Sequence, residues 1–405
     1  PYEKAPTLLL VASLLGRSVR ARRALRPLHA SLCFCAQAAM ASTVMTPALL
    51  PLQALTPQML VDAVPQVPLH EARKVVAMVY RDEPVRASSA LSSHTASHVL
   101  AAGHVPTLDV VSEHHSQLDP FRKYVLKTGD GALLETVRIP LEKPGRFSVC
   151  VSSQVGCALA CSFCATGRMG LVRNLDAWEI LEQVRVVHRG LKSEGAGRVH
   201  GVVFQGMGEP MANLDKVLTA IRVLSDPCGL AVDQRGITVS TAGIPAGMLR
   251  LAREAPKVRL ALSLHSARPA VRRSIMPIQQ AHSFDDVMDA AVEHARITNL
   301  SPMWSITPLL GVNDSMEDAD AMAELARTFV TRTGKWPRIS IIPYNRIADD
   351  ASDPFRRITD DGEERFRRAM SKVGVGTHKR YSGGHDVGAA CGQLVTASSR
   401  KSLAR

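Results

Sequence analysis

The stretch Gln154-Val155-Gly156-Cys157-Ala158-Leu159-Ala160-Cys161-Ser162-Phe163-Cys164 places three cysteines at a C-x3-C-x2-C spacing. Three thiolates on one short loop can bind three irons of a four-iron, four-sulfur (4Fe-4S) cluster, whereas a complete electron-transfer cluster uses four protein ligands. No fourth cysteine follows at a ferredoxin spacing, so one iron would keep an open position, as catalytic metal sites do. That iron could chelate the amino and carboxylate groups of S-adenosylmethionine, whose one-electron cleavage yields a 5′-deoxyadenosyl radical. The spacing therefore predicts a cluster on Cys157, Cys161 and Cys164, with S-adenosylmethionine as the second cofactor.

Two other interpretations of the three cysteines remain open at this point. A zinc knuckle would need a fourth Cys or His ligand nearby, and the next downstream candidate is the distant His188. Three buried thiols without a metal would be an unusual use of so tight a group. The iron–sulfur interpretation is the one that the spacing favours.

Composition points to an anionic partner. The chain has 405 residues, a formal net charge of +12 and a pI near 9.6. It is long enough for one large domain and a small one. Nucleic acid is the first candidate for an anionic partner and a membrane surface the second, while simple solubility is the alternative explanation of the charge.

Cysteine usage bears on the cellular compartment. Eight cysteines in a chain of this length do not make a disulfide scaffold. A cluster of this kind is assembled in a reducing compartment, so we expect the cytoplasm, or an organelle matrix if residues 1–45 are a transit segment. Residues 5–45 are rich in Ala, Ser, Leu and Arg, and the apolar run Leu8–Leu15 is too short to span a bilayer. We interpret 1–45 as a disordered, targeting or upstream segment, and expect a monomer with no membrane partner.

The pattern of apolar and turn-forming residues divides the chain into two folded parts. Residues 46–118 are expected to form a small helical accessory domain and linker, because Thr56-Pro57 is a helix start and residues 69–80 have apolar side chains at helical spacing. Residues 119–395 are expected to form the catalytic domain, and 396–405 a tail. This larger domain opens with a predicted hairpin, Tyr124–Leu126 and Leu133–Ile139, around the turn signal Asp130-Gly131.

A regular alternation of strands and helices follows. The predicted strands are Phe147–Ser152, Gly201–Gln205, Gly236–Thr241, Arg259–Leu264, Met303–Leu309 and Arg338–Pro343. The predicted helices are Asp176–Leu191, Leu214–Leu224, Pro245–Ala255, Phe284–Ile297, Met316–Thr331 and Asp361–Lys372. Such alternation indicates parallel βα units. We predict an α/β fold: an open (βα)6 partial TIM barrel with its active site at the C-terminal ends of the strands.

Polar motifs follow these strand ends and therefore predict one shared pocket. They are the cysteine loop, Gly206-Met207-Gly208-Glu209-Pro210, Ser240-Thr241, Ser263-Leu264-His265 and Pro343-Tyr344-Asn345. Glycine lets a backbone approach a ligand closely, and the carboxylate of Glu209 can accept hydrogen bonds from an ammonium or a ribose. Ser240, Ser263, Asn345 and His265 could hold ribose hydroxyls or carboxylate oxygens. A hydrogen-bonded structural imidazole is an equally good interpretation of His265.

Three further residues by themselves indicate little about function. Cys150 lies on the first predicted strand, and Cys391 lies among small residues in Gly388-Ala389-Ala390-Cys391-Gly392-Gln393-Leu394. Either cysteine is more typical of a small buried apolar side chain. Glu135 is, on its own, one more surface carboxylate.

Several motifs in the same order resemble the RlmN/Cfr family of radical-SAM RNA methyltransferases. They are Cys150–Cys157, Cys164-Ala165-Thr166-Gly167, Gly206–Pro210, Ser240-Thr241-Ala242-Gly243, Ser263-Leu264-His265-Ser266, Gly311-Val312-Asn313-Asp314-Ser315 and Ala389–Leu394. The similarity runs from about Glu135 to Leu394, and the helical unit at 56–82 is more weakly similar to the family's accessory domain.

The resemblance implies methylation of an adenine ring carbon in RNA, most often C2 of an adenosine in 23S rRNA and also in tRNA, or C8 in Cfr-like members. It implies a methyl-cysteine at Cys391, a base at Glu135, and resolution by Cys150 through a transient disulfide. It further implies that Gly208, Glu209, Ser240, Ser263, Leu264, His265 and Asn345 bind S-adenosylmethionine. An electron donor such as flavodoxin or ferredoxin is also expected.

Two departures from the family pattern put the RNA target in doubt. The segment before the terminal cysteine is Gly384-His385-Asp386-Val387-Gly388 rather than an acidic run, and Ser305 stands where an acid is common. The alternatives are therefore a divergent radical-SAM enzyme acting on another RNA or at C8, and an inert RNA-binding paralogue. Basic residues that could contact RNA phosphates are Arg268, Arg272, Arg273, Arg356, Arg357, Arg365, Arg367, Arg368, Lys379 and Arg380.

Overall fold

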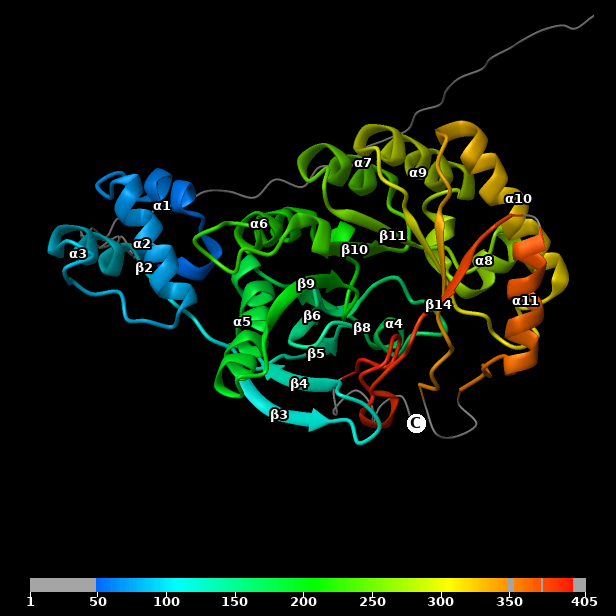
Figure 1. Cartoon of the computed structure of the whole chain (residues 1–405), viewed down its shortest axis with the longest axis horizontal. Coiled ribbons are helices and arrows are strands. Elements are labelled where there is room, and N and C mark those ends of the chain that lie inside the picture. The colour runs from blue at the N-terminus through cyan, green and yellow to red at the C-terminus, as the bar shows by residue number, and fades with distance from the viewer. Residues whose placement is uncertain (1–48, 348–352, 373, 396–405) are drawn as a thin grey trace, which may run out of the picture. The chain divides into compact units, whose positions relative to one another are not determined.

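The computed structural model of the chain describes residues 49–347, 353–372 and 374–395 (Figure 1). The expectations for residues 1–45 and 396–405 lie outside these ranges. The element order alternates strands and helices through most of the chain, as predicted.

A single ten-stranded sheet organises the described residues. Its strand order is β14-β13-β12-β11-β10-β9-β6-β5-β4-β3, and the sheet is open because its edge strands β14 and β3 do not pair with each other. The seven parallel strands are β6 (Arg146–Val151), β9 (Arg198–Phe204), β10 (Ile237–Thr241), β11 (Arg259–Ser263), β12 (Met303–Ile306), β13 (Arg338–Ile341) and β14 (Thr377–Lys379). The open (βα)6 prediction is confirmed, with β14 as an additional strand after the sixth helix.

Helices connect each parallel strand to the next. They are α5 (Ala177–Ser193), α6 (Leu214–Leu224), α7 (Pro245–Glu254), α8 (Pro269–Ile275) with α9 (Phe284–Thr298), α10 (Met316–Thr333) and α11 (Asp360–Lys372). Helices α7, α9, α10 and α11 follow one another around the outside of the strands in Figure 1. Their apolar faces form one core with the strands, in which Trp304 and Phe329 are almost completely buried.

Two predicted strands end two or three residues earlier than expected. The strand predicted over 303–309 stops at Ile306, and the one predicted over 338–343 stops at Ile341. Pro308 and Pro343 explain both ends, because proline has no N–H to donate to a neighbouring strand. The residues that follow these strands, such as Thr307 and Asn345, line a cavity.

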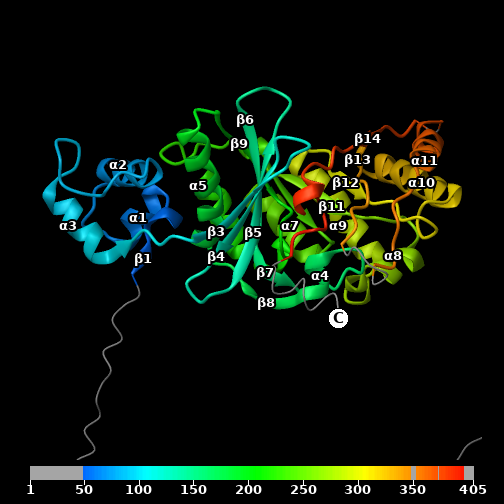
Figure 2. The ribbon, with the colours of Figure 1, turned by 90° about the horizontal axis from the view of Figure 1, so that it is seen from below.

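Strands β3 (Asp109–His115), β4 (Arg122–Lys127) and β5 (Leu133–Pro140) extend the sheet antiparallel beside β6, as Figure 2 shows. The β4–β5 hairpin turns at Gly131, whose φ of 84° suits glycine. Strand β3 was not predicted. The sheet therefore begins at Asp109, inside the range expected to be helical domain and linker.

Residues 49–104 form a helical unit with its own core. It comprises α1 (Pro57–Ala63), α2 (Leu69–Tyr80), α3 (Ser93–Ala102) and the short parallel pair β1 (Leu50–Pro51) and β2 (Gly103–His104). Thr56 caps α1, since its hydroxyl accepts a hydrogen bond from the Met59 N–H at 3.2 Å.

The remaining short elements lie around the strand ends. A hairpin of β7 (Gln154–Cys157) and β8 (Gly170–Asn174) encloses the cysteine loop and the short helix α4 (Ala165–Met169). The 3-10 turn His385–Val387 precedes Cys391. None of the helices among the described residues is both long and apolar enough to cross a lipid bilayer.

Candidate active site

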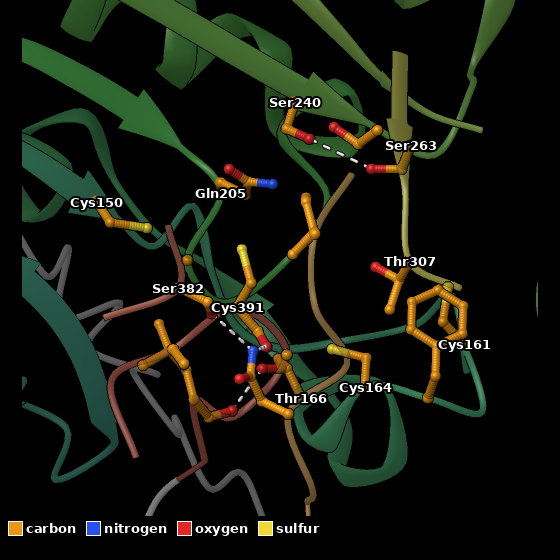
Figure 3. A pocket seen from close by; sticks show the side chains of 18 of the residues that line it. Cys150, Cys161, Cys164, Thr166, Gln205, Ser240, Ser263, Thr307, Ser382 and Cys391 are labelled. Atoms are coloured by element: carbon orange, nitrogen blue, oxygen red, sulfur yellow. Dashed lines mark hydrogen bonds between the residues drawn. The ribbon is translucent and has the colours of Figure 1, made fainter. Parts of the chain in front are cut away.

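A cavity of about 210 Å³ lies at the C-terminal ends of the parallel strands (Figure 3). Its walls come from the cysteine loop, from the ends of β6 and β9–β14, and from the segment around Cys391. Of the predicted site residues, those lining it are Cys150, Cys157, Cys161, Cys164, Gly208, Glu209, Ser240, Ser263, His265, Asn345 and Cys391. Leu264 and Glu135 are buried just outside this lining.

The cysteine loop presents all three thiols to the cavity. Cys157 ends β7 and Cys164 is the N-cap of α4. Gly167 allows the loop to fold tightly, because a Cβ there would lie 2.9 Å from the backbone N and O of Cys161. Burial, and then the neighbouring thiols, raises the pKa of Cys161, so these groups are poorly placed as three free thiolates in the absence of positive charge.

The three thiols fit the cluster that the sequence predicts. Thiolate sulfur is the donor that iron–sulfur clusters take, and a bound cation would offset the unfavourable burial of charge that raises the pKa of Cys157 to about 12. Among the described residues, no three His, Cys, Asp or Glu side chains converge on the position of one metal ion. A cluster does not need that geometry, since each cysteine binds its own iron atom.

Serine hydroxyls line the wall opposite the cysteine loop. Ser240 Oγ and Ser263 Oγ lie 3.3 Å apart at the ends of β10 and β11 (Figure 3). Ser305 on β12 is 1% exposed, lines the same cavity, and its hydroxyl has no hydrogen-bond partner among the described residues. A buried hydroxyl without a partner is costly unless a ligand satisfies it. This wall therefore fits a polar ligand such as S-adenosylmethionine.

The Gly206–Pro210 loop is fixed by its own contacts. Gly208 has a φ of 99°, and a Cβ there would lie 2.5 Å from the Gln154 Cβ. The buried carboxylate of Glu209 accepts hydrogen bonds from Met211 N at 3.0 Å and Ala242 N at 2.9 Å. Burial raises the pKa of Glu209 and these backbone donors oppose it. The carboxylate thus ties the β9 loop to the end of β10 while it lines the cavity.

His265 is buried and neutral. Its Nδ1 accepts a hydrogen bond from Thr307 N at 3.2 Å, which leaves Nε2–H as the donor. Burial, with a contribution from Arg272, lowers the pKa of His265 to about 3. Its φ of 58° is rare for a residue with a side chain and typical of functional sites.

Leu264 and Arg272 support this wall from behind. The Leu264 carbonyl accepts a hydrogen bond from Arg272 Nε at 3.1 Å. The Arg272 guanidinium, which is completely buried, also donates to Gln279 Oε1 at 3.0 Å and to the Ala242 carbonyl. The suggestion that Arg272 contacts RNA phosphates is therefore wrong, because its donors are used inside the protein.

The segment carrying Cys391 is tied to both sides of the cavity. Ala165 N donates to Gly392 O at 2.8 Å, and Thr166 Oγ1 donates to Leu394 O at 2.5 Å. Asn345 Nδ2 donates to Cys391 O at 3.2 Å and to Ser382 Oγ at 2.8 Å. These bonds place a cysteine from the C-terminal region beside the cysteine loop.

Cys391 lies between two other thiols of the cavity (Figure 3). Burial raises the pKa of Cys150 to about 12, and the proximity of Cys391 adds to the rise. Burial also raises the pKa of Cys164, again with a contribution from Cys391. Arg380 opposes the rise at Cys150, and its Nη1 donates to Gln205 Oε1 at 2.8 Å. Cys150 and Cys391 are both free thiols in the structure.

Glu135 is buried beneath the Cys391 segment. Its Oε2 accepts a hydrogen bond from Val395 N at 2.8 Å, and its Oε1 lies 3.1 Å from Lys123 Nζ. Glu135 is therefore not the surface carboxylate that the sequence alone suggests. The structure places it against the segment that contains Cys391, whereas its role remains a prediction.

Sequence reasoning missed three polar residues of this region. Lys123 and Gln205 lie within or next to apolar strand patterns, where a charged or amide side chain is itself an unusual signal. Arg380 was named only as a possible contact for RNA phosphates, and the structure shows that it lines the cavity. Apart from the buried Arg272, the other members of that group are exposed or partly exposed, and Arg268, Arg357, Arg367, Arg368 and Lys379 make ion pairs.

Comparisons with known proteins show which family the chain resembles. The model of the radical SAM superfamily matches residues 151–326. A protein of Sorangium cellulosum named "Probable RNA methyltransferase" is 51% identical over 349 residues, covering 82% of this chain and 89% of that protein. The "Probable dual-specificity RNA methyltransferase RlmN" of Moorella thermoacetica is 38% identical, covering 68% of this chain and 76% of that protein.

A solved structure is also similar. The crystal structure of a radical SAM methyltransferase from Sphaerobacter thermophilus has a TM-score of 0.76 and 33% sequence identity, covering 85% of this chain and 99% of that chain.

Proposed function

The chain belongs to the RlmN-type RNA methyltransferases of the radical SAM superfamily, and from this premise we propose that it methylates C2 of an adenosine in 23S rRNA, and also in tRNA, through a methyl group carried on Cys391. As a member of this family it is an S-adenosylmethionine-dependent radical enzyme with a 4Fe-4S cluster. The observation that carries the finer proposal is the position of Cys391 between Cys150 and Cys164, close enough to raise the pKa of each.

The target carbon explains why such cofactors are needed. An adenine ring carbon is electron-poor and cannot attack a methyl sulfonium directly, so methyl transfer by simple displacement fails. The cluster on Cys157, Cys161 and Cys164, with S-adenosylmethionine bound, supplies a radical that can remove a hydrogen from a methyl group. We assign the binding of S-adenosylmethionine to Ser240, Ser263, Ser305 and the Nε2–H of His265, because these polar groups belong to residues that line the cavity.

Cys391 first takes a methyl group from S-adenosylmethionine on its sulfur, with loss of the thiol proton and S-adenosylhomocysteine as the leaving group. After that methyl group loses a hydrogen atom, its carbon bonds to the adenine. Its carbonyl is held by Asn345, and Gly392 and Leu394 are held by α4. These bonds fix the backbone while the side chain stays in the cavity. The segment can therefore deliver the sulfur without a large movement.

Glu135 acts as the base that removes the ring proton. Lys123 Nζ lies 3.1 Å from Glu135 Oε1 and is the positive charge that faces this buried carboxylate. The Val395 N–H now occupies one carboxylate oxygen. We infer that this hydrogen bond is exchanged for the substrate when the RNA base enters.

Cys150 releases the product. Its thiolate attacks the Cys391 sulfur, so that a disulfide forms as the bond between that sulfur and the product carbon breaks. The released carbon keeps the electron pair of that bond, which the adenine ring delocalises, and takes up one proton to become the methyl group. Thiolate is the reacting form, and Arg380 is the cation that favours it. An external reductant must then reopen the disulfide before another turnover.

The surroundings fit RNA as the substrate. The net charge of +12 favours a polyanion, and the target base must leave its stack to reach the cavity. We further propose a monomer that works in the cytoplasm, or in an organelle matrix, with a flavodoxin or ferredoxin as electron donor.

Anaerobic reconstitution tests the proposal. Protein loaded with iron and sulfide is incubated with 23S rRNA fragments or tRNA, S-adenosylmethionine and a reductant, and the methylated nucleoside is located by mass spectrometry. We expect C2-methyladenosine, which is lost in Cys391→Ala and retained in Cys228→Ala, a free cysteine outside the cavity lining. Methylation that survives Cys391→Ala would contradict the mechanism.

A second candidate is methylation of another RNA, or at C8. The observation that favours it is the distinctive segment before Cys391, in which Asp386 accepts hydrogen bonds from Ser116 Oγ and Gln117 N, each at 2.8 Å. Ser305, where the family often has an acid, points the same way. Mass spectrometry of total RNA exposed to the enzyme separates the two candidates by the position of the methyl group and the RNA that carries it.

A further inference from the structure

Tyr381 is an exposed aromatic side chain at the rim of the cavity. It lines the cavity together with Cys391, and 67% of its surface is accessible. Among the described residues, Trp336, at 45%, is the only other aromatic side chain with comparable exposure, and it does not line the cavity. The chain is poor in aromatic residues, at 4%. An exposed ring at the mouth of the site is therefore a specific feature of this surface.

The Tyr381 ring is held in one orientation. Its hydroxyl donates a hydrogen bond to Asp119 Oδ2 at 2.9 Å. The Phe121 ring lies behind it, with centroids 6.0 Å apart and planes tilted by 59°. Phe121 is buried and lines the cavity as well.

The loop around Tyr381 is built to keep this arrangement. Asp119 Oδ2 also accepts a hydrogen bond from Gly384 N at 2.9 Å, so one carboxylate fixes both the ring and the backbone beyond it. Gly383 is needed for the packing, because a Cβ there would lie 2.4 Å from the Phe121 ring. The ring is thus preorganised although it is exposed, and a ligand would lose little free energy in ordering it.

An exposed, preoriented ring beside a basic RNA site is suited to stacking on a nucleobase. Proteins recognise unpaired bases by stacking them on aromatic side chains, largely without regard to sequence. When the target adenosine leaves its stack, the neighbouring bases lose a stacking partner. Arg380, the residue before Tyr381, lines the cavity and adds positive charge at the same rim.

We propose that Tyr381 is a stacking platform for an unpaired base of the RNA substrate, next to the adenosine that enters the cavity. This inference rests on RNA being the substrate of this site, and it adds a base-binding subsite at the rim.

Variants of one side chain separate stacking from a structural role. Tyr381→Leu removes the ring and keeps an apolar side chain, while Tyr381→Phe keeps the ring and loses the bond to Asp119. Trp336→Leu is the matched control for loss of an exposed ring elsewhere. We expect Tyr381→Leu to raise the KM and the dissociation constant for RNA by between about 5-fold and 100-fold. We expect both other variants to stay within about 2-fold of the wild type.

Methylation of Cys391, which takes place without RNA, reports whether a variant keeps the structure of the site. Methylation of Cys391 needs S-adenosylmethionine and an intact loop but no RNA base. It should be unchanged in Tyr381→Leu if the ring binds RNA. Its loss, or an unchanged dissociation constant for RNA, would overturn the proposal.

A modified RNA identifies the stacked base. Substrates with an abasic nucleotide on the 5′ or 3′ side of the target adenosine are compared by direct binding. One of them should weaken binding to the wild type by the factor seen for Tyr381→Leu, with no further loss in the variant. Additive losses with both RNAs would contradict stacking. Because binding is measured without turnover, this result stands apart from whether the methyl group goes to C2.

Discussion

Lys123 and Glu135 form a buried ion pair. Each partner also makes a hydrogen bond to the backbone near Cys391, Lys123 to a residue before it in the chain and Glu135 to a residue after it. The Nζ–Oε1 distance is 3.1 Å, and the side chains are only 5% and 2% exposed. Lys123 Nζ donates to Gly388 O at 3.4 Å, while Glu135 Oε2 accepts from Val395 N at 2.8 Å. The pair on β4 and β5 therefore fixes the base proposed for catalysis and the segment that carries the methyl group.

Replacing Lys123 by Met should destabilise the protein strongly. Removal of one partner of a buried ion pair leaves an uncompensated charge, which typically costs about 3–5 kcal/mol in the free energy of unfolding. Chemical denaturation measures the loss. The double variant Lys123→Met with Glu135→Leu should recover most of it, because no buried charge remains. A double variant as unstable as the single one would show that the pair is not the cause.

The attack of Cys150 on the Cys391 sulfur, which releases the product, should become faster as the pH rises. Burial raises the pKa of Cys150 to about 12, so between pH 7 and 9 the thiolate fraction increases about tenfold per pH unit. Arg380→Gln removes the cation that lowers this pKa, so resolution should be slower at every pH with the same slope. The measurement is the decay of the covalent RNA–Cys391 adduct on denaturing gels.

Arg380→Lys and Arg273→Gln are the controls for that experiment. Lysine restores the charge and should recover part of the rate, whereas Arg273 is exposed and outside the cavity lining, so its loss should change little. A rate independent of pH, or equal effects of both glutamine variants, would exclude an electrostatic role of Arg380.

Ser305→Ala should weaken S-adenosylmethionine binding without destabilising the ligand-free protein. The Ser305 hydroxyl has no partner among the described residues, so its removal relieves an unsatisfied buried group. With ligand bound, the variant lacks one hydrogen bond, worth about 1 kcal/mol or roughly 5-fold in affinity. Anaerobic calorimetry of the cluster-loaded enzyme gives the affinity. Unchanged affinity would mean that Ser305 does not contact the ligand.

Acid should weaken the helical unit through Glu71. Hydrogen bonds from Thr95 and then from Ser92 lower the pKa of Glu71 from 4.5 to about 2. Because the pKa is lower in the folded state, the stabilisation is complete above pH 4.5 and is lost as pH falls towards 2. Thermal denaturation from pH 6 to 2 should show this loss for the wild type, and a smaller one for Glu71→Gln. Parallel pH profiles would contradict the assignment.

The βα units were predictable because their signal is local and repeated. Apolar runs of strand length alternate with helical periodicity, and the polar motifs follow directly after the strands. Strand β3 lacks that signal, since six of its seven residues are exposed and its pattern does not alternate. Strand β14 has three residues, too few to show a period. Both are sheet edges, where burial does not impose a pattern.

The cavity was predictable as a set of strand ends, but its internal contacts were not. Cys391 and Glu135 were identified by resemblance, because nothing local distinguishes a reactive thiol from a buried one. Glu135 meets the Cys391 segment through the N–H of Val395, and a backbone donor leaves no mark in the sequence. The pairing of Arg380 with Gln205 joins residues 175 positions apart and needed the folded chain.

The bonds from Ala165 and Thr166 to Gly392 and Leu394 join two segments that are 228 residues apart at their farther pair. Because a chain is synthesised from its N-terminus, the cysteine loop is made long before the segment that carries Cys391. The wall of the cavity that holds Cys391 can therefore be completed only after the parallel strands have been made.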